Sequence, residues 1–599
     1  IHISRPLGKY NNIHRKYSEI IYKKKMVQDY SCRILPQKAV EGIRIMKRYA
    51  TITQTPMSVK VAHTYLKRLD FIRFINGHVA WDKNQVNLTP GQLALGIVLS
   101  TFCSARYPLS RIPQHFASMN TELLFGNGVA ASDFTDDALA RTLDKIFDAG
   151  CSTMFTQLSL TAFTTFDIPL GNLHSDTSSH AFYGDYDCCA DPEWEAAMIT
   201  HGFSKEHRPD LKQIMIGNIV NSDGIPLVHR TLDGNTADCQ WNDEAIRTLT
   251  TLLKDKTKDV VYIADAKLVT EPNLRLMHKH QLPFISRVPD NFSSQLASRV
   301  KKEAYGSDEW QDLGSLKDDK KHATYHGISF HRHLGLEKVR LLVVKSSAGQ
   351  DTCQERINKE RRSLQCLLRD LEKQDFACEP DARQAAEEFT KKHSKKFFRL
   401  SYTLDSNVVY KRSVGNPGKQ PKSPREIVSW NIKINVSDHV STIQSYQEQS
   451  ESFVLITNIP ADKLDDRSLL MRYKQQHVVE TGFRWLRQPC MASTIFLKRP
   501  ERIEALMMLI HVALLIRALM QQQARLRVKQ KDQPPRIDLN GQKLENPTAE
   551  KILVLLINHG VITDRGEHYY AHCTDKEWER LKVLLDLLGV TEEELLAMA

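Results

Sequence analysis

The stretch Val260-Val261-Tyr262-Ile263-Ala264-Asp265 decides the fold class of this 599-residue chain. Its first five residues are apolar or favour β-structure almost without interruption, which is typical of a central strand buried on both faces of a sheet. An aspartate follows directly at the end of the strand. Burial of a carboxylate costs free energy unless a cation neutralises it, so Asp265 is a candidate metal ligand as well as an ordinary strand-end acid.

The segments on either side of this stretch alternate between strand and helix patterns. Before it we predict strands at Leu173–Ser178, Lys212–Val220 and Gly224–Leu232, the last two forming a hairpin around Asn221–Gly224, and a helix at Asn242–Leu253. After it we predict a helix at Pro272–His280 and a strand at Pro283–Arg287. Three strands followed by alternating helix and strand indicate a mixed α/β sheet.

The remaining chain adds helical and β-rich parts. Residues 58–149 are mainly helical, with a helix start at Thr89–Gln92, and suit either a helix-turn-helix DNA reader or a helical dimerisation or packing domain. Residues 290–452 interrupt the alternation with a charged helix, Gln354–Lys373, and strand-like stretches, which predicts an inserted β-rich module. A strand at Phe453–Ile456 and a long helix from about Asp465 to Arg487 then resume the α/β pattern.

The length of the chain exceeds what one hydrophobic core usually supports, and we expect six consecutive segments. They are a basic N-terminal segment (1–57), a helical candidate DNA-binding domain (58–165), a first α/β part (166–289), the β-rich insertion (290–452), a second α/β part with the long helix (453–530) and a helical C-terminal region (531–599). The first segment is expected to be partly disordered, or an upstream extension if the natural start is Met26, Met46 or Met57.

Composition excludes several classes of protein. A hydrophobic fraction of 41% with 26% charged residues is typical of a folded chain and not of a disordered, collagen-like or coiled-coil one. The longest apolar run, Ile503–Met520, contains Glu504, His511 and Arg517, so we expect no membrane span. No apolar signal follows Lys23–Lys25, which leaves the cytosol as the expected location. Eleven cysteines without a Cys-x-x-Cys pair predict reduced thiols.

The net charge of +11 makes a polyanionic partner plausible but does not identify one. Residues 1–50 alone hold twelve Lys or Arg and three Asp or Glu. Because the excess is concentrated there, overall basicity is weak evidence for a nucleic-acid partner.

Three carboxylates lie where an active site would place them. Asp176 lies on the first predicted strand, Asp265 ends the buried strand, and Glu480 lies in the long helix. Oxygen ligands favour Mg²⁺ or Mn²⁺ over zinc. A single strand-end aspartate is more often a cap or a loop acid than a metal ligand. The three carboxylates together are therefore stronger evidence for a metal site than any one of them alone.

The helix around Glu480 is more informative. At 100° per residue, one sector of about 120° is polar and the opposite side is apolar. The polar sector contains Tyr473, Gln476, His477, Glu480, Arg484 and Arg487, and the apolar side contains Val478, Val479, Gly482, Trp485 and Leu486. A lone carboxylate among cations and a Tyr hydroxyl suits a phosphate backbone beside a metal ligand.

The spacing Tyr473-x2-Gln476-x3-Glu480-x6-Arg487 resembles the Y-x2-R-x3-E-x6-K signature of a superfamily of bacterial insertion-sequence DDE transposases. The resemblance extends over roughly residues 60–530 and includes the Asp176 strand, His201–Gln213, Leu232–Asp238 and Phe496–Glu504. Gln476 and Arg487 depart from the signature: the first removes a charge and the second keeps it with a different geometry. We expect these departures to affect how a DNA end is held more than whether chemistry is possible.

The resemblance implies an RNase H-like catalytic domain with a β-rich insertion before the glutamate. Asp176, Asp265 and Glu480 are the implied catalytic residues and together hold two Mg²⁺ or Mn²⁺ ions. The implied function is metal-dependent strand cleavage and strand transfer at the ends of the protein's own insertion sequence. The implied partners are double-stranded DNA, at the transposon ends and the target, and a second copy of the chain in the synaptic complex. The implied location is the bacterial cytoplasm, at the nucleoid, with no membrane association.

The helix face and the resemblance also indicate DNA contacts. Those expected near the cleaved end are Tyr473, Lys474, Gln476, Arg484 and Arg487; those expected along the DNA path are Lys205, Arg208 and Lys212, with Lys419, Lys422 and Arg425 in the insertion. For the last six, a solvated surface cation is an equally good interpretation. Trp485 lies on the apolar side of its helix, so we expect packing and not stacking on a flipped base.

An acidic cluster, two histidines and an apolar stripe are better explained by structure than by catalysis. The acids Asp185, Asp187, Asp191, Glu193 and Glu195 are expected to form a solvated loop and not to supply a metal ligand. His174 and His180 lack the Cys or His spacing of a zinc site. The seven-residue stripe of Ile357, Leu364 and Leu371, or the helical C-terminus, is expected to contribute a dimer interface.

Two other functions fit the same residues. One is an RNase H-like nuclease without strand transfer, and joining of a labelled 3′ end to a target would separate it from a transposase. The other is a DNA-binding repressor or a catalytically decayed remnant, which metal-dependent nicking would exclude.

Overall fold

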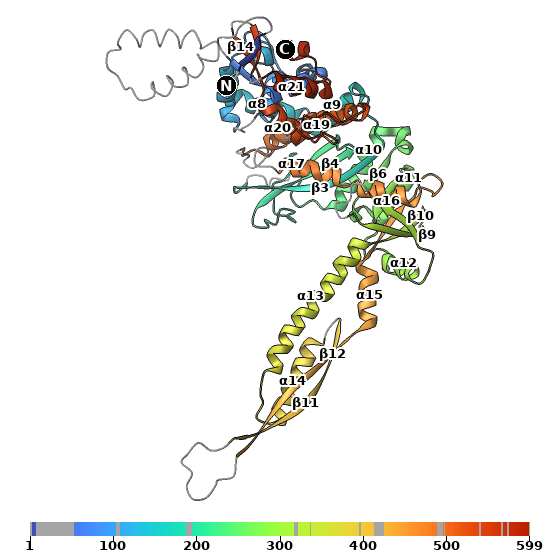
Figure 1. Ribbon diagram of the computed structural model, residues 1–599. Coiled ribbons are helices and arrows are strands. Elements are labelled where there is room, and N and C mark those ends of the chain that lie inside the picture. The colour runs from blue at the N-terminus through green and yellow to red at the C-terminus, as the bar shows by residue number, and fades with distance from the viewer. Residues whose placement is uncertain are drawn as a thin grey trace, which may run out of the picture. The chain divides into compact units, whose positions relative to one another are not determined.

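A computed structural model describes residues 3–6, 53–84, 86–103, 108–186, 195–316, 322–335, 337–394, 397–411, 425–487, 495, 497–537, 541–564, 567–571 and 574–597. The chain folds as two compact units (Figure 1). Unit 1 consists of Ile1–Asp265 with Gln475–Ala599, and unit 2 consists of Ala266–Lys474. Both units combine helices with strands, so the mixed α/β class predicted from the sequence is confirmed.

Unit 1 contains consecutive strands of a mixed sheet in the order β5-β4-β3-β6. They are β3 (Asn172–Phe182), β4 (Lys212–Asn221), β5 (Pro226–Leu232) and β6 (Val261–Ala264). β3 and β5 each run antiparallel to β4, whereas β6 lies parallel to β3 on its other side. The predicted central strand is confirmed, because Tyr262, Ile263 and Ala264 of β6 are at most 1% exposed.

Two helices cover opposite faces of β3. α10 (Asp238–Leu253) packs Trp241 on Gly217 of the neighbouring strand, where an added Cβ would come within 2.6 Å of the indole, and Trp241 Nε1 donates to Ser175 Oγ. α17 (His477–Leu486) contacts β3 on the other face, at Ser178. Side chains alternate along a strand. The α10 face of β3 therefore carries Ser175 and Thr177, and the α17 face carries His174, Asp176 and Ser178.

Helices from both ends of the chain pack around α19 (Pro500–Gln530). The contacting helices are α3 (Met57–Arg68), α5 (Pro90–Ser100), α8 (Asp136–Asp148), α9 (Cys151–Thr165), α17, α20 (Ala549–Ile557) and α21 (Asp575–Leu588). The shorter helices of unit 1 are α4 (Phe71–His78), α6 (Ile112–Phe116), α7 (Thr121–Phe125) and α22 (Glu592–Leu596). The predicted helix start at Thr89 is confirmed, because Thr89 and Gln92 form a reciprocal capping box before Pro90 starts the helix.

α19 is long and apolar enough to cross a membrane by length and composition, but 94% of its most apolar window is buried inside the structure. It is therefore the core helix of this part of the chain. Its interior cation is paired: the Arg517 guanidinium bonds Glu550 and lies 4.6 Å from the centre of the Trp485 ring. Trp485 is only 4% exposed, which confirms the predicted packing role.

A small sheet joins the two ends of the chain in the order β1-β15-β14-β2. Its strands are β1 (Ile3–Pro6), β2 (Thr53–Pro56), β14 (Gly560–Asp564) and β15 (Glu567–Ala571), and they pair antiparallel. The prediction that 531–599 is helical is therefore only partly right: α20 and α21 are helices, but β14 and β15 between them pair with strands from the segment 1–57.

Unit 2 contains antiparallel strands in the order β7-β13-β10-β9-β8. They are β7 (Phe284–Arg287), β8 (Gln311–Ser315), β9 (Thr324–Leu334), β10 (Glu337–Ser346) and β13 (Ser452–Thr457). The helices α11 (Glu271–Lys279), α12 (Leu296–Tyr305) and α16 (Asp466–Lys474) accompany them. Strands β8 to β10 belong to the expected insertion, and they extend the sheet because β10 pairs with β13, which follows the insertion.

The rest of unit 2 is a separate layer of helices on a hairpin (Figure 1). It consists of α13 (Ser347–Glu372), α14 (Glu379–His393), β11 (Phe398–Lys411), β12 (Arg425–Asp438) and α15 (Val440–Ser450). β11 is one continuous strand, and it spans two of the strand-like stretches predicted in the insertion, Phe398–Leu404 and Val408–Tyr410.

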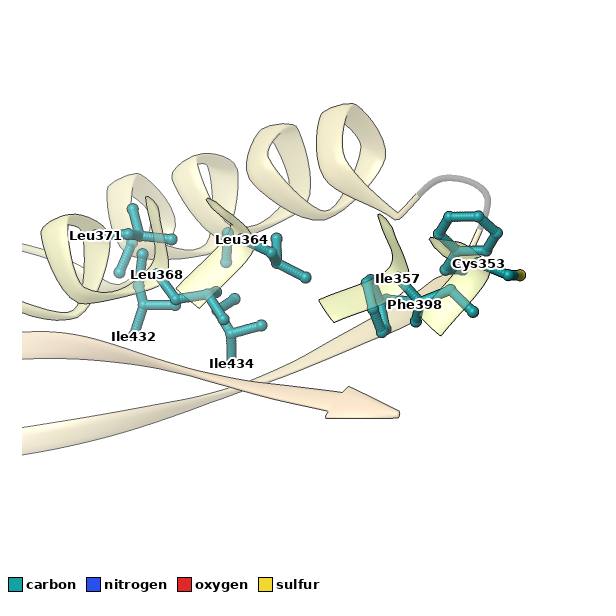
Figure 2. Packing of buried hydrophobic residues seen from close by; sticks show 11 residues of the cluster. Cys353, Ile357, Leu364, Leu368, Leu371, Phe398, Ile432 and Ile434 are labelled. Carbon is teal, nitrogen blue, oxygen red and sulfur yellow. The ribbon is translucent and has the colours of Figure 1, made fainter. Parts of the chain in front are cut away.

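The core of this layer uses the seven-residue stripe of α13. Ile357, Leu364 and Leu371 are 2%, 7% and 8% exposed. Figure 2 shows Leu364 and Leu371 near Ile432 and Ile434 of β12, and Ile357 beside Phe398 of β11. The prediction that this stripe contributes a dimer interface is wrong, because the hairpin already covers it.

The long helix predicted from Asp465 to Arg487 is two helices. α16 ends at Lys474 in unit 2 and α17 begins at His477 in unit 1. Between them Gln475 and Gln476 form a turn, and their carbonyls accept the N–H groups of Val478 and Val479 at a tighter, three-residue spacing. The sequence has no Gly or Pro here to signal the break.

Candidate active site

Asp176 lies in the middle of β3, on the face covered by α17. Its Oδ1 accepts the N–H of Thr177 at 2.8 Å, and its side chain is 24% exposed. Burial raises the pKa of Asp176 to about 6; nearby Asp265 and Asp238 raise it further, while Lys205 and the Thr177 N–H oppose the shift. A carboxylate in this position is under strain from burial and like charge, and a cation would relieve both.

Asp265 follows the last residue of β6 and is half-buried. Because β6 is parallel to β3 with Ala264 opposite Ser175, the next residues along the two strands, Asp265 and Asp176, come to the same level of the sheet. The electrostatic effect of Asp265 on Asp176 agrees with this placement. The structure therefore brings together two of the three predicted carboxylates.

Glu480 is exposed on α17, and two side chains of that helix segment fix its place over β3. Gln476 Nε2 donates to the Ser175 carbonyl at 2.9 Å, and Arg487 Nη2 donates to Ser178 Oγ at 2.6 Å. Glu480 is one turn after Gln476, about 6 Å along the axis. It therefore lies between the two anchors, beside the part of β3 that carries Asp176.

The donor chemistry of these three residues suits a hard cation such as Mg²⁺ or Mn²⁺. Within the described residues, however, no three His, Cys, Asp or Glu side chains lie close enough to hold one ion together. Burial, together with the neighbouring acids, raises the pKa of Asp176, so a cation beside this carboxylate would be stabilised. Asp176, Asp265 and Glu480 fit the metal in ligand type, and the exposed Glu480 side chain must approach the aspartates to complete the set.

The ammonium of Lys205 lies close to the carboxylates of Asp176 and Asp238. Its Nζ donates to the carbonyl and the Oγ1 of Thr177, at 2.8 and 2.7 Å, and lies 3.3 Å from Asp238 Oδ1 and 3.6 Å from Asp176 Oδ1. The sequence analysis missed Asp238. The available signal was its position at the end of the Leu232–Asp238 segment that carries part of the resemblance.

The other predicted DNA contacts are dispersed. Arg208 forms a two-nitrogen bond with Asp210 and lies 5.7 Å from the centre of the Tyr183 ring, and Lys212 bonds the carbonyl of Asp185. Arg484 is exposed on α17, on the same face as Glu480. In unit 2, Lys474 lies 5.6 Å from the Phe453 ring and Tyr473 packs near the same ring.

Gln476 and His174 form a buried polar pair under α17. His174 is fully buried, and Gln476, which is half-buried, lies close enough to its ring to act as a hydrogen-bonding neighbour that opposes the fall in its pKa. Burial lowers the pKa of His174 to about 4, with His477 adding to the shift. A neutral Gln at position 476 therefore lies next to a neutral histidine.

Parts of the sequence predictions lie outside the described residues. Among the acids of the predicted loop, Asp185 and Glu195 are described, whereas Asp187, Asp191 and Glu193 are not. Lys419 and Lys422 are also outside, as is the side chain of Arg425. His180 is 8% exposed and contacts the Phe182 ring.

Asp176 and Asp265 thus lie at the same level of two neighbouring parallel strands, and Glu480 lies on a helix that contacts β3. Comparison with protein families gives the class of this chain. The family described as "Transposase DDE domain" matches residues 216–516, half of the chain. The chain belongs to this family of DDE transposases, a group of nucleic-acid-cleaving enzymes. The match includes Asp265 and Glu480 and begins after Asp176.

Other comparisons add less. A domain of unknown function, DUF4277, matches residues 59–160, a range that begins within α3 and ends within α9. No curated protein matches the chain. Among solved structures, the cryo-EM structure of the piggyBac transposase synaptic complex with hairpin DNA aligns over 90% of this chain and 88% of that one, with 11% identity. The TM-score of 0.36 is too low to show a shared fold.

Proposed function

We propose that the chain is a transposase of the Y-x2-R-x3-E-x6-K superfamily of bacterial insertion sequences. It binds the ends of its own insertion sequence and catalyses metal-dependent cleavage of a DNA strand, followed by transfer of the cut end to target DNA. The observation that carries the proposal is that Asp176 and Asp265 lie at the same level of two neighbouring parallel strands, while the helix that carries Glu480 is bonded to β3.

The proposed catalytic domain is RNase H-like. Support comes from the order β5-β4-β3-β6, in which three antiparallel strands precede a parallel strand reached through the helix α10. In this arrangement the first acid lies on the first strand and the second acid ends the parallel strand.

Asp176, Asp265 and Glu480 are the proposed ligands of two Mg²⁺ or Mn²⁺ ions. When bound, such ions activate the attacking oxygen and stabilise the leaving oxygen of an in-line displacement at phosphorus. The protein's part is positional: the Thr177 N–H orients Asp176, the end of β6 orients Asp265, and the anchors of α17 orient Glu480.

The proposed DNA contacts hold the scissile phosphate next to the three proposed metal ligands. Arg484 and Arg487 are exposed along the same helix as Glu480, so both present positive charge where a phosphate backbone would pass. Tyr473, Lys474, Gln476, Lys205, Arg208 and Lys212 complete the proposed set. Because strand transfer joins two transposon ends, we propose that two copies of the chain form the synaptic complex, in the bacterial cytoplasm at the nucleoid.

The test uses a duplex carrying the inverted repeat that flanks the coding sequence, incubated with Mg²⁺ or Mn²⁺. Wild-type protein is expected to nick this duplex and to join the labelled 3′ end to a target plasmid. Asp176→Asn, Asp265→Asn and Glu480→Gln are each expected to bind the duplex without cutting it. Asp243→Asn, which removes an acid paired with Arg247 on α10, is the matched control and should cut normally.

Each alternative outcome has a definite meaning. Cutting without joining would show a nuclease in place of a transposase. Binding without cutting by the wild-type protein would show a regulatory or decayed copy. Normal cutting by any of the three acid variants would remove that residue from the proposed active site.

A further inference from the structure

We propose that Asp238 and Lys205 form an anchored ion pair whose task is to keep the Lys205 ammonium out of the metal position at Asp176. The inference rests on the proposed function, since it concerns the same carboxylates. Asp238 is thereby a positioning residue that acts through Lys205.

The bonds of Lys205 show how it is held. Two donors of its ammonium go to Thr177, at 2.8 Å to the carbonyl and 2.7 Å to Oγ1, and the third side faces Asp238 Oδ1 at 3.3 Å. Thr177 Oγ1 in turn donates to the same Asp238 oxygen at 2.5 Å. Three partners therefore pull the ammonium toward the α10 face of β3, which is the face opposite Asp176.

The distance to Asp176 shows what the pair prevents. Lys205 Nζ lies 3.6 Å from Asp176 Oδ1, within ion-pair range but beyond a hydrogen bond. The contacts of Asp176 among the described residues, with the Thr177 N–H and Lys205, both involve Oδ1. A short side-chain rotation would bring the ammonium onto Asp176 itself, where it would neutralise the acid and exclude a divalent ion.

The charges explain why a fixed position matters. With Asp238 in place, the positive charge of Lys205 is balanced locally and Asp176 keeps its own charge for a divalent ion. Without Asp238, the acid that remains in ion-pair range of the Lys205 ammonium among the described residues is Asp176, a proposed metal ligand. Lys205, Asp238 and Asp176 are each about one-quarter exposed, so the pair stays accessible enough to rearrange without unfolding the sheet.

The experiment is a double-mutant cycle read out as Mn²⁺ binding. Calorimetric titration of Mn²⁺ into DNA-free protein would compare wild type, Asp238→Asn, Lys205→Gln and the double variant. Loss of one carboxylate lowers divalent affinity in any background by electrostatics alone. If Lys205 is also released, Asp238→Asn should lower the affinity about tenfold more in the wild-type background than in the Lys205→Gln background.

Controls separate this effect from folding and general charge. Lys205→Arg retains the charge and should keep the coupling to Asp238. Arg247→Gln and Asp243→Asn, which break an exposed ion pair on α10, should leave Mn²⁺ affinity unchanged. Thermal unfolding of each variant in chelator checks that the sheet is intact.

The possible results are distinct. If Asp238→Asn lowers the Mn²⁺ affinity by the same factor in the wild-type and Lys205→Gln backgrounds, the ion-pair role is overturned and the transposase proposal stays intact. The same result would be found if Asp238 were a direct metal ligand. Mn²⁺ binding by wild type that Asp176→Asn does not weaken, or no Mn²⁺ binding at all, would overturn the proposed metal site and this inference with it.

Discussion

Replacement of Asp176 by Asn is expected to stabilise unit 1 while abolishing activity. Burial and the neighbouring acids raise the pKa of this carboxyl to about 6, so the folded protein holds a charge in a place that disfavours it. The amide of Asn has nearly the same shape and still accepts the Thr177 N–H through its oxygen. The substitution therefore removes the unfavourable charge and keeps the local hydrogen bond.

The magnitude follows from the pKa difference between the folded and unfolded states. A shift from 3.8 to about 6 corresponds to about 3 kcal/mol once the group is charged in both states. Because the folded pKa is raised, the folded state binds the proton more tightly, and the destabilisation is absent well below pH 3.8 and complete above pH 6. The gain from Asp176→Asn should thus be about 3 kcal/mol at pH 7.5 and about 1 kcal/mol at pH 4.5.

The assay is thermal unfolding of wild type and variant in chelator at both pH values. The melting temperature of the variant should exceed that of wild type at pH 7.5 by clearly more than at pH 4.5. Asp210→Asn is the control, since Arg208 lowers the pKa of that exposed acid and its removal should not stabilise the protein. A destabilised Asp176→Asn protein at pH 7.5, or a gain of equal size at both pH values, would refute the reasoning.

Three further predictions concern packing and buried histidines. His511 is buried and stacked on His229 with ring centres 3.4 Å apart, and burial lowers its pKa to about 4, so unit 1 should lose stability as the pH falls from 6.5 toward 4. His511→Gln should reduce this loss, measured as the fall of the melting temperature between pH 6.5 and pH 4, and an unchanged fall would contradict the prediction. Gly217→Val should destabilise unit 1 by about 1–3 kcal/mol because a Cβ there would overlap Trp241, and a variant with wild-type unfolding in denaturant would contradict this. Leu364→Ala should lower protection from hydrogen exchange in α13 by about 2–4 kcal/mol and leave β3 unchanged, whereas uniform loss in both units would contradict a local core.

Local patterns were sufficient for the strands β4, β5 and β6 of unit 1. β6 was predictable because a short apolar run can be buried on both faces only in a central strand. The hairpin of β4 and β5 was predictable from turn residues between two strand patterns, and Asp265 followed from its place at the end of β6. In each case the physical cause lies within a few consecutive residues.

Long-range features were not predictable in the same way. Nothing in the sequence between Lys474 and His477 marks the break between α16 and α17, since no Gly or Pro is present there. The stripe of α13 correctly indicated burial, but the pattern does not specify whether a second copy or the chain's own hairpin buries it. The approach of Lys205 to Asp238 depends on a loop folding back on β3, which neither segment shows alone.

The two departures from the transposase signature have a common structural meaning. Position 476, where the signature has Arg, holds a Gln whose Nε2 bonds the Ser175 carbonyl; position 487, where it has Lys, holds an Arg whose Nε and Nη2 both contact Ser178 Oγ. Both residues therefore tie α17 to β3, one on each side of Glu480. A flexible Lys ammonium offers a less directed contact to Ser178 than the planar guanidinium does. We therefore propose that Gln476 and Arg487, in addition to any contact with DNA, fix the helix that carries Glu480 against β3.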